Sequence, residues 1–174
     1  MASALIALGG NVGDVRATFR QAIPEICRRA QATLAARSSD YITPPWGEEQ
    51  QPPFVNACIA IQTTIAPPAL LAILHDVERM FGRNRAQETR WGPRTLDLDL
   101  IAYDDLILDT PDVTLPHPQL FERGFVLVPL AEIVPERRIA GRRVDEAVSL
   151  LLRLNGAERL PHARVVQAYQ LKDR

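Results

Sequence analysis

The chain is almost without lysine. Lys172 is the only one, although 20 of the 174 residues are lysine or arginine. Arginine must therefore hold any phosphate that the protein binds, and its planar fork donates two parallel hydrogen bonds. The formal net charge of −1 leaves no basic field of the kind that attracts nucleic acid. We therefore expect no nucleic-acid partner.

Cysteines and long apolar runs are also scarce. Cys27 and Cys58 are the only cysteines and lie in no metal-binding or redox spacing, which predicts buried free thiols. No apolar run approaches the roughly 20 residues that a bilayer-spanning helix needs. The opening MASALIALGG is too short for a signal peptide. We expect a cytoplasmic protein without a membrane partner, folded as a single domain over residues 1–174.

The spacing of apolar residues predicts an α+β fold. Strands are expected over residues 3–8, 33–43, 54–64, 96–103 and 106–108, with a possible strand after 160. Asp14 is expected to cap a first helix that Pro24 kinks or splits. Further helices are expected over residues 67–82, 126–133 and 145–154. The order strand–helix–strand occurs twice, which predicts a ferredoxin-like βαββαβ core with C-terminal additions. Both core helices would cover one face of an antiparallel sheet and leave the other face available.

Two aspartates are expected on that available face. Residues 96–100 read Leu-Asp-Leu-Asp-Leu, and alternate side chains of a strand point to opposite faces. The leucines match the helix-covered face, so Asp97 and Asp99 share the other face with Phe54 and Asn56. Their Cα atoms would lie about 6 to 7 Å apart, from the rise per residue of a strand. This spacing suits one or two hard divalent cations, with Mg²⁺ the first choice because it shares its coordination shell with substrate phosphates.

Four arginines precede the aspartate strand: Arg83, Arg85, Arg90 and Arg94. Taken alone, two aspartates on a strand are equally well explained as a solvated surface, but the arginines favour phosphate chemistry. The turn GGNVG lacks the Gly-Lys-Ser/Thr ending of a P-loop and is interpreted as a tight turn. His117, between two prolines, either contacts phosphate or caps a turn. No Ser-His-Asp or Cys-His set has a recognisable spacing, so no protein nucleophile is predicted.

Four segments together resemble one enzyme family. They are ALGGNVGD, TPPWGEEQQPPFVNA, RWGPRTLDLDLI and LPHPQLFERGFVLVPLAEI, in this order over residues 3–135. They are similar to the signature segments of the 6-hydroxymethyl-7,8-dihydropterin pyrophosphokinases of folate biosynthesis. The resemblance implies transfer of a pyrophosphoryl group from ATP to the hydroxymethyl group of the pterin, with AMP released. It also implies two Mg²⁺ ions, and two small-molecule substrates as partners. We expect a monomer. The tail over residues 156–174 lies beyond the resemblance.

The resemblance also implies roles for individual residues. Asp97 and Asp99 would bind the metal ions, and Phe54 and Phe125 would sandwich the pterin ring. The residues that match the pterin site are Thr43, Pro44, Trp46, Phe54, Asn56 and Phe125. Those that match the ATP site are Arg83, Arg85, Trp91, Arg94, His117 and Arg123. Arg83 and Arg94 would be catalytic together with the two aspartates.

Two other classes of protein stay open on the residues alone. A palm-type nucleotidyl transferase also presents an Asp-x-Asp pair on a ferredoxin-like sheet, but the neutral charge argues against its nucleic-acid track. A non-catalytic nucleotide- or RNA-binding module would place aromatics on the central strands, as Phe54 is placed. Paired aspartates on the same face would repel phosphate in such a module.

Overall fold

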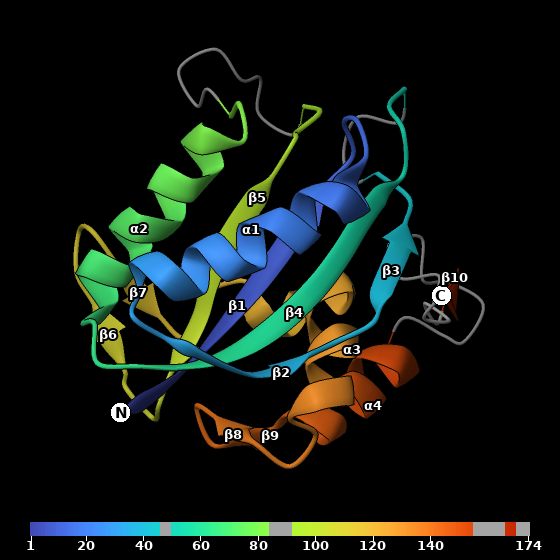
Figure 1. Cartoon of the computed structure of the whole chain (residues 1–174). Coiled ribbons are helices and arrows are strands. Elements are labelled where there is room, and N and C mark those ends of the chain that lie inside the picture. The colour runs from blue at the N-terminus through green and yellow to red at the C-terminus, as the bar shows by residue number, and fades with distance from the viewer. Residues whose placement is uncertain (46–49, 84–91, 155–165, 170–174) are drawn as a thin grey trace.

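An antiparallel sheet forms the centre of the molecule (Figure 1). The structure, a computed structural model, describes residues 1–45, 50–83 and 92–154, and the backbone of 166–169. The strand order is β10-β3-β4-β1-β5, and β2 also pairs with β4. The strands are β1 (Ala2–Gly10), β2 (Thr33–Arg37), β3 (Asp40–Thr43), β4 (Phe54–Thr63), β5 (Asp97–Tyr103) and β10 (Val166–Tyr169). The predicted α+β class is confirmed.

One predicted strand is in fact two. The interpretation of residues 33–43 as a single strand is wrong, because the chain breaks between β2 and β3 at Ser38 and Ser39. The Ser38 Oγ accepts a hydrogen bond of 2.9 Å from the Cys58 N–H, in place of a backbone carbonyl. The Ser39 N–H is turned away from the sheet and donates to the Glu132 carboxylate at 2.9 Å. The Ser38 N–H still donates to the Cys58 carbonyl at 2.9 Å, so side-chain acceptors replace only part of the backbone ladder at this point.

Helices α1 (Val15–Arg29) and α2 (Pro67–Met80) cover one face of the sheet. The Asp14 carboxylate caps α1 by accepting from the Ala17 N–H at 2.9 Å, as predicted. The apolar stripe of α1 is buried: Val15, Phe19, Ile23 and Ile26, followed by Ala30 at the C-cap. Pro24 does not split α1, because it lies on the exposed side, where water can satisfy the carbonyl that loses its donor.

The opposite face is only partly open, which corrects the expectation that it is left free. Helices α3 (Gly124–Ile133) and α4 (Val144–Leu154) pack on it. A second apolar cluster joins Leu5, Cys58 and Ala60 of the sheet to Val126, Leu127 and Leu130 of α3. The strands carry apolar residues on both faces here, so both faces must be covered. The uncovered part is the end of the sheet that bears Asn56, Asp97 and Asp99.

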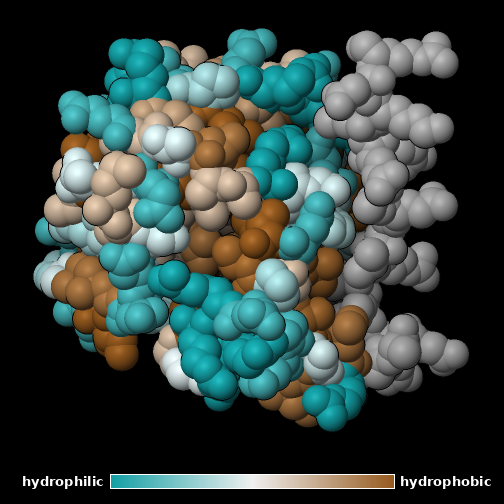
Figure 2. All heavy atoms as spheres, turned by 60° about the horizontal axis from the view of Figure 1, so that its bottom comes forward, coloured by the Kyte–Doolittle hydropathy of each residue, from teal (hydrophilic) through white to brown (hydrophobic). Residues whose placement is uncertain are grey.

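The remaining elements are short. They are β6 (Leu108–Asp109), β7 (Thr114–Leu115), the 3₁₀ turn η1 (Leu120–Glu122), β8 (Arg138–Ile139) and β9 (Arg142–Arg143). The strand expected over residues 106–108 therefore begins only at Leu108. On the face that comes forward in Figure 2, hydrophilic and hydrophobic residues are intermingled. Both cysteines are free, with Cys58 buried and Cys27 partly buried. Within the described ranges, no helix has the length and apolarity needed to cross a membrane.

Candidate active site

The uncovered end of the sheet is hollowed around a glycine. The strand register places Gly9 of β1 directly between Asn56 of β4 and Asp97 of β5. A Cβ atom on Gly9 would lie 3.2 Å from the Asn56 Oδ1 and 3.8 Å from the Asp97 Cβ. The missing side chain therefore opens a pocket between an amide and a carboxylate. The pocket is lined by Gly9, Thr43, Pro44, Phe54, Asn56, Arg94, Asp97, Arg123 and Phe125.

One side of this pocket is aromatic and amide-bearing. Phe54 is the first residue of β4 and Phe125 lies in the first turn of α3, so the two rings come from different layers of the fold. The Asn56 Nδ2 donates to the Thr43 Oγ1 at 2.8 Å, and both residues are buried. This bond fixes the plane of the amide at the pocket wall. The structure thus gathers the predicted pterin-site residues that it describes.

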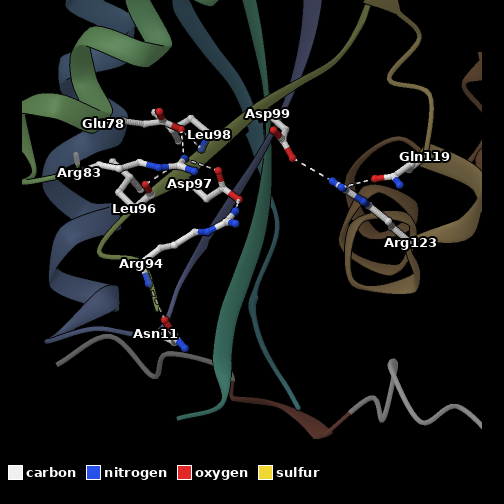
Figure 3. A network of polar contacts seen from close by, with 10 residues as sticks. All are labelled: Asn11, Glu78, Arg83, Arg94, Leu96, Asp97, Leu98, Asp99, Gln119 and Arg123. Atoms are coloured by element: carbon white, nitrogen blue, oxygen red, sulfur yellow. Dashed lines mark hydrogen bonds and ion pairs between the residues drawn. The ribbon is translucent and has the colours of Figure 1, made fainter. Parts of the chain in front are cut away.

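The other side is a network of carboxylates and arginines (Figure 3). The Asp97 carboxylate accepts from Arg94 Nη1 at 2.7 Å and from Arg83 Nη1. Burial raises the pKa of Asp97, but the two guanidinium groups outweigh this and hold the pKa below its usual value. Asp97 is therefore an anion at neutral pH, and it faces the pocket with 23% of its side chain exposed.

The second carboxylate, Asp99, forms an ion pair with a third arginine. Arg123, between η1 and α3, donates from Nη1 to the Asp99 Oδ2 at 3.1 Å and from Nη2 to the Gln119 Oε1. Its guanidinium carbon also lies 5.7 Å from the centre of the Phe125 ring, within cation–π range. Arg123 therefore links the acidic pair to the aromatic side of the pocket.

Glu78 is a member of the network that the sequence interpretation missed. Its side chain is buried on α2, and its Oε1 accepts from Arg83 Nη1 at 2.5 Å and from the Leu98 N–H at 2.8 Å. Leu98 lies between the two aspartates on β5, so Glu78 hydrogen-bonds both to Arg83 and to the strand that carries the aspartates. The available signal was its position, since it follows the buried Leu74 by four residues on the inward side of α2.

The donor set fits magnesium. Asp97 and Asp99 point from alternate positions of β5 to the same face. Nowhere in residues 1–45, 50–83 or 92–154 do three or more histidine, cysteine, aspartate or glutamate side chains gather into a metal-binding group. Two carboxylates suit an ion that completes its shell with water and substrate phosphate, as Mg²⁺ does. Three predicted site residues, Trp46, Arg85 and Trp91, lie outside the described residues.

His117 is expected to titrate below pH 6.5, the usual value for histidine. Burial lowers the pKa of its imidazole. The Asp99 carboxylate raises this pKa, and the positive charge of Arg123 lowers it further. Below about pH 6.5 this imidazole binds more protons in the unfolded chain than in the folded protein. The stability that neutral, buried His117 contributes at higher pH is therefore lost as the pH falls through the folded-state pKa. An NMR titration of the three imidazoles, with His117→Asn for assignment, measures it. A midpoint above 6.5 for His117 would contradict the burial argument.

These features define an α+β protein with an arginine-bracketed carboxylate pair beside an aromatic pocket, an arrangement typical of metal-dependent phosphate chemistry. Solved structures share the fold. The chain matches a crystal structure of an HPPK-DHPS protein in complex with substrates at a TM-score of 0.71 and 12% identity. A Plasmodium falciparum HPPK-DHPS with pteroate matches at a TM-score of 0.71 and 11% identity. These matches cover 90% of this chain but only 44% and 43% of those chains.

Sequence comparisons identify the family. The model for 7,8-dihydro-6-hydroxymethylpterin-pyrophosphokinase (HPPK) matches residues 5–135. A 2-amino-4-hydroxy-6-hydroxymethyldihydropteridine pyrophosphokinase of Methylorubrum extorquens is 42% identical over 151 residues, which cover 87% of this chain and 94% of the relative. The Bacillus subtilis protein of the same name is 37% identical, over 92% of this chain and 96% of its own length. The chain belongs to the 7,8-dihydro-6-hydroxymethylpterin-pyrophosphokinase family.

Proposed function

We propose that this protein transfers the pyrophosphoryl group of ATP to the hydroxymethyl oxygen of 6-hydroxymethyl-7,8-dihydropterin and releases AMP. The observation that carries the proposal is the pocket itself. A row of Asn56, Gly9 and Asp97 across three strands puts an amide and an ionised carboxylate on either side of one hollow. Phe54 and Phe125 line the same hollow. A planar heterocycle with a reactive hydroxyl needs aromatic and amide groups that bind its ring, and a carboxylate near its hydroxyl.

The arginines would serve the nucleotide. Arg83, Arg94 and Arg123 converge on the acidic pair from three connecting segments, after α2, before β5 and between η1 and α3 (Figure 3). Each guanidinium would stabilise charge that gathers on the transferred group and on the departing AMP. His117 lies near Asp99 and would contact the nucleotide. Arg85 and Trp91 remain predicted members of this subsite.

Asp97 and Asp99 would hold two Mg²⁺ ions. When bound, magnesium offsets the charge of the triphosphate and lowers the pKa of the pterin hydroxyl. The chain's part is to hold both carboxylates on one face and to keep Asp97 ionised. Arg83 and Arg94 do this for Asp97 by lowering its pKa.

Asn56 would bind the polar edge of the pterin, because an amide both donates and accepts. Phe54 and Phe125 would stack on the ring, with Thr43, Pro44 and Trp46 completing the pocket. Phe125→Ala is expected to raise the KM for pterin about 5- to 150-fold, since one base–aromatic stack contributes about 1–3 kcal/mol. Steady-state kinetics with each substrate varied in turn measures it.

A matched control is Phe121→Ala, because Phe121 stacks under Arg142 with 5.0 Å between guanidinium and ring centre and does not line the pocket. It should leave the KM for pterin within about twofold of wild type. If Phe125→Ala changes only the KM for ATP, the stacking role is wrong.

The test of the function is to incubate the protein with ATP, Mg²⁺ and 6-hydroxymethyl-7,8-dihydropterin and to identify the nucleotide product. AMP that forms only with pterin present supports the proposal. ADP would instead indicate a simple kinase. Released pyrophosphate would indicate the palm-type nucleotidyl transferase, and pterin binding without any nucleotide product would indicate a binding module.

Three further expectations, on the fold, the oligomeric state and the location, are proposed with this function. The order β5-β1-β4-β3, with α1 and α2 on one face, supports the ferredoxin-like assignment of the core. The monomeric state and the cytoplasmic location stay predictions from the sequence. Sedimentation of the purified protein tests the first of these two.

A further inference from the structure

Glu132 of α3 hydrogen-bonds to the sheet through both of its carboxylate oxygens. Its Oε2 accepts from the Tyr41 hydroxyl at 2.7 Å, and its Oε1 accepts from the Ser39 hydroxyl at 2.8 Å. The Ser39 N–H adds a bond of 2.9 Å to Oε2. Burial and the neighbouring carboxylate raise the pKa of the Tyr41 hydroxyl, so this group remains a donor at neutral pH. One exposed carboxylate therefore binds three donors at the start of β3.

These donors lie beside the part of the pocket that the sheet forms. We call this part the strand wall: Thr43, Phe54 and Asn56. Tyr41 lies directly opposite Asn56 in the register of β3 and β4. Thr43 lies opposite Phe54 in the same register. Opposed residues of two strands, and alternate residues of one strand, share a face of the sheet. Tyr41 therefore belongs to the row of side chains that carries the strand wall.

The opposite wall of the pocket lies on the same side of α3 as Glu132. Phe125 precedes Glu132 by seven residues, which is close to two turns at about 3.6 residues per turn. The two side chains therefore leave the helix in nearly the same direction. Pro129, between them, leaves the Phe125 carbonyl without its helical donor, but its ring fixes φ and keeps this turn stiff. A rotation of α3 that breaks the Glu132 bonds also turns the Phe125 ring.

Other contacts between α3 and the sheet are less directional. Val126, Leu127 and Leu130 belong to an apolar cluster with the sheet, and the hydrophobic effect is non-directional. The Cys58 thiol, a weak donor, lies 3.6 Å from the Val126 carbonyl oxygen. Hydrogen bonds weaken steeply when their angle changes. The bonds of Glu132 therefore restrict rotation of α3 more sharply than the apolar cluster does.

We propose that Glu132 is a positioning residue that fixes the direction in which the Phe125 ring faces the strand wall. The inference rests on the proposed function, in which this ring stacks on the pterin. Glu132 is not among the described residues that line the pocket, so it acts on the substrate only through α3. Arg123 at the start of α3 is held separately by Asp99 and Gln119. Loss of the Glu132 bonds should therefore weaken the binding of pterin and spare that of the nucleotide.

Three variants separate the hydrogen bonds of Glu132 from its charge. Glu132→Ala removes all the acceptors. Glu132→Gln removes the charge only, because an amide oxygen can still accept from Ser39 and Tyr41. Tyr41→Phe removes one donor and leaves α3 unchanged. The control is Glu136→Ala, the same truncation at a carboxylate that follows α3, is 83% exposed and lies 3.7 Å from Arg143.

The experiment is calorimetric titration of the full-length protein with 6-hydroxymethyl-7,8-dihydropterin at saturating magnesium and α,β-methylene-ATP. That analogue resists cleavage of the bond that the reaction breaks. We expect Glu132→Ala to raise the Kd for pterin by a factor of about 5 to 12, the middle to upper range for one net hydrogen bond. Tyr41→Phe should cause part of this rise. Glu132→Gln and Glu136→Ala should stay within about twofold of wild type, and the Kd for the analogue should change in none of the four.

A double-mutant cycle shows whether Glu132 acts through the ring. In a Phe125→Ala background the ring is gone, so Glu132→Ala should raise the Kd for pterin by less than about twofold. An equal factor in both backgrounds would mean that Glu132 only stabilises the fold, and it would overturn the inference. An unchanged Kd in Glu132→Ala would overturn it as well. If thermal unfolding shows that Glu132→Ala fails to fold, Tyr41→Phe takes its place in the cycle. A wild-type protein that binds no pterin and forms no AMP would instead refute the proposed function, independently of Glu132.

Discussion

Replacing Asp97 by asparagine is expected to lower kcat by on the order of 10³-fold, because the charge stabilisation supplied at a metal site amounts to several kcal/mol at 1.36 kcal/mol per tenfold. Asparagine has nearly the same shape as aspartate, but it is neutral and is a poor ligand for magnesium. It also leaves Arg83 and Arg94 without the carboxylate that now orients them. The measurement is single-turnover formation of AMP at saturating ATP and pterin.

The fold of this variant should survive. Asp97 lies at the first position of β5 with part of its side chain exposed, and Arg83 keeps its bond to Glu78. The control is Asp112→Asn, which makes the same chemical change at an exposed carboxylate outside the pocket. It should retain the wild-type rate. An Asp97→Asn protein with near wild-type kcat and an unchanged magnesium requirement would refute the assignment of Asp97 as a metal ligand.

Where local pattern decides, the sequence was sufficient. Leu96, Leu98 and Leu100 are buried under α1 and α2, whereas Asp97 and Asp99 face the other way, because side chains of a strand alternate. Asp14 caps α1 because a carboxylate beside free N–H groups stabilises a helix start wherever it occurs. Most of the motif residues that the structure describes line one pocket: Thr43, Pro44, Phe54, Asn56, Arg94, Asp97, Arg123 and Phe125.

Where tertiary partners decide, the sequence was not sufficient. Nothing in the pattern of residues 144–154 shows that α4 packs beside α3 on the second face of the sheet. The break at Ser38 depends on Cys58 and Glu132, which are distant in the sequence. Glu78 reads as one more polar residue of a helix until its partners on β5 are known. Partners of this kind are set by the fold as a whole.

Glu78→Leu is expected to lower the free energy of unfolding by about 2–6 kcal/mol, because two buried donors lose this acceptor at about 1–3 kcal/mol each, although Arg83 keeps its second partner, Asp97. The Arg83 side chain is only 4% exposed, so it cannot turn to water when its bond of 2.5 Å to Glu78 is lost. The buried Leu98 N–H would lose its acceptor as well. Urea unfolding with an unchanged m-value measures the loss.

The same change at an exposed glutamate is the control. Glu146→Leu on α4 should alter the free energy of unfolding by no more than about 0.5 kcal/mol, because 66% of its side chain is exposed. Glu78→Gln should cost less than Glu78→Leu, since its amide oxygen can still accept from the Leu98 N–H.

A double-mutant cycle then shows whether Glu78 acts through Arg83. Arg83→Met leaves Glu78 as a buried carboxylate with one partner fewer, so this change alone should also be strongly destabilising. Combined with Glu78→Leu, it replaces the pair by apolar side chains, and the double variant should lose less stability than the sum of the single losses. Strict additivity would mean that the two side chains contribute independently, and Glu78 would then be a support for β5 alone.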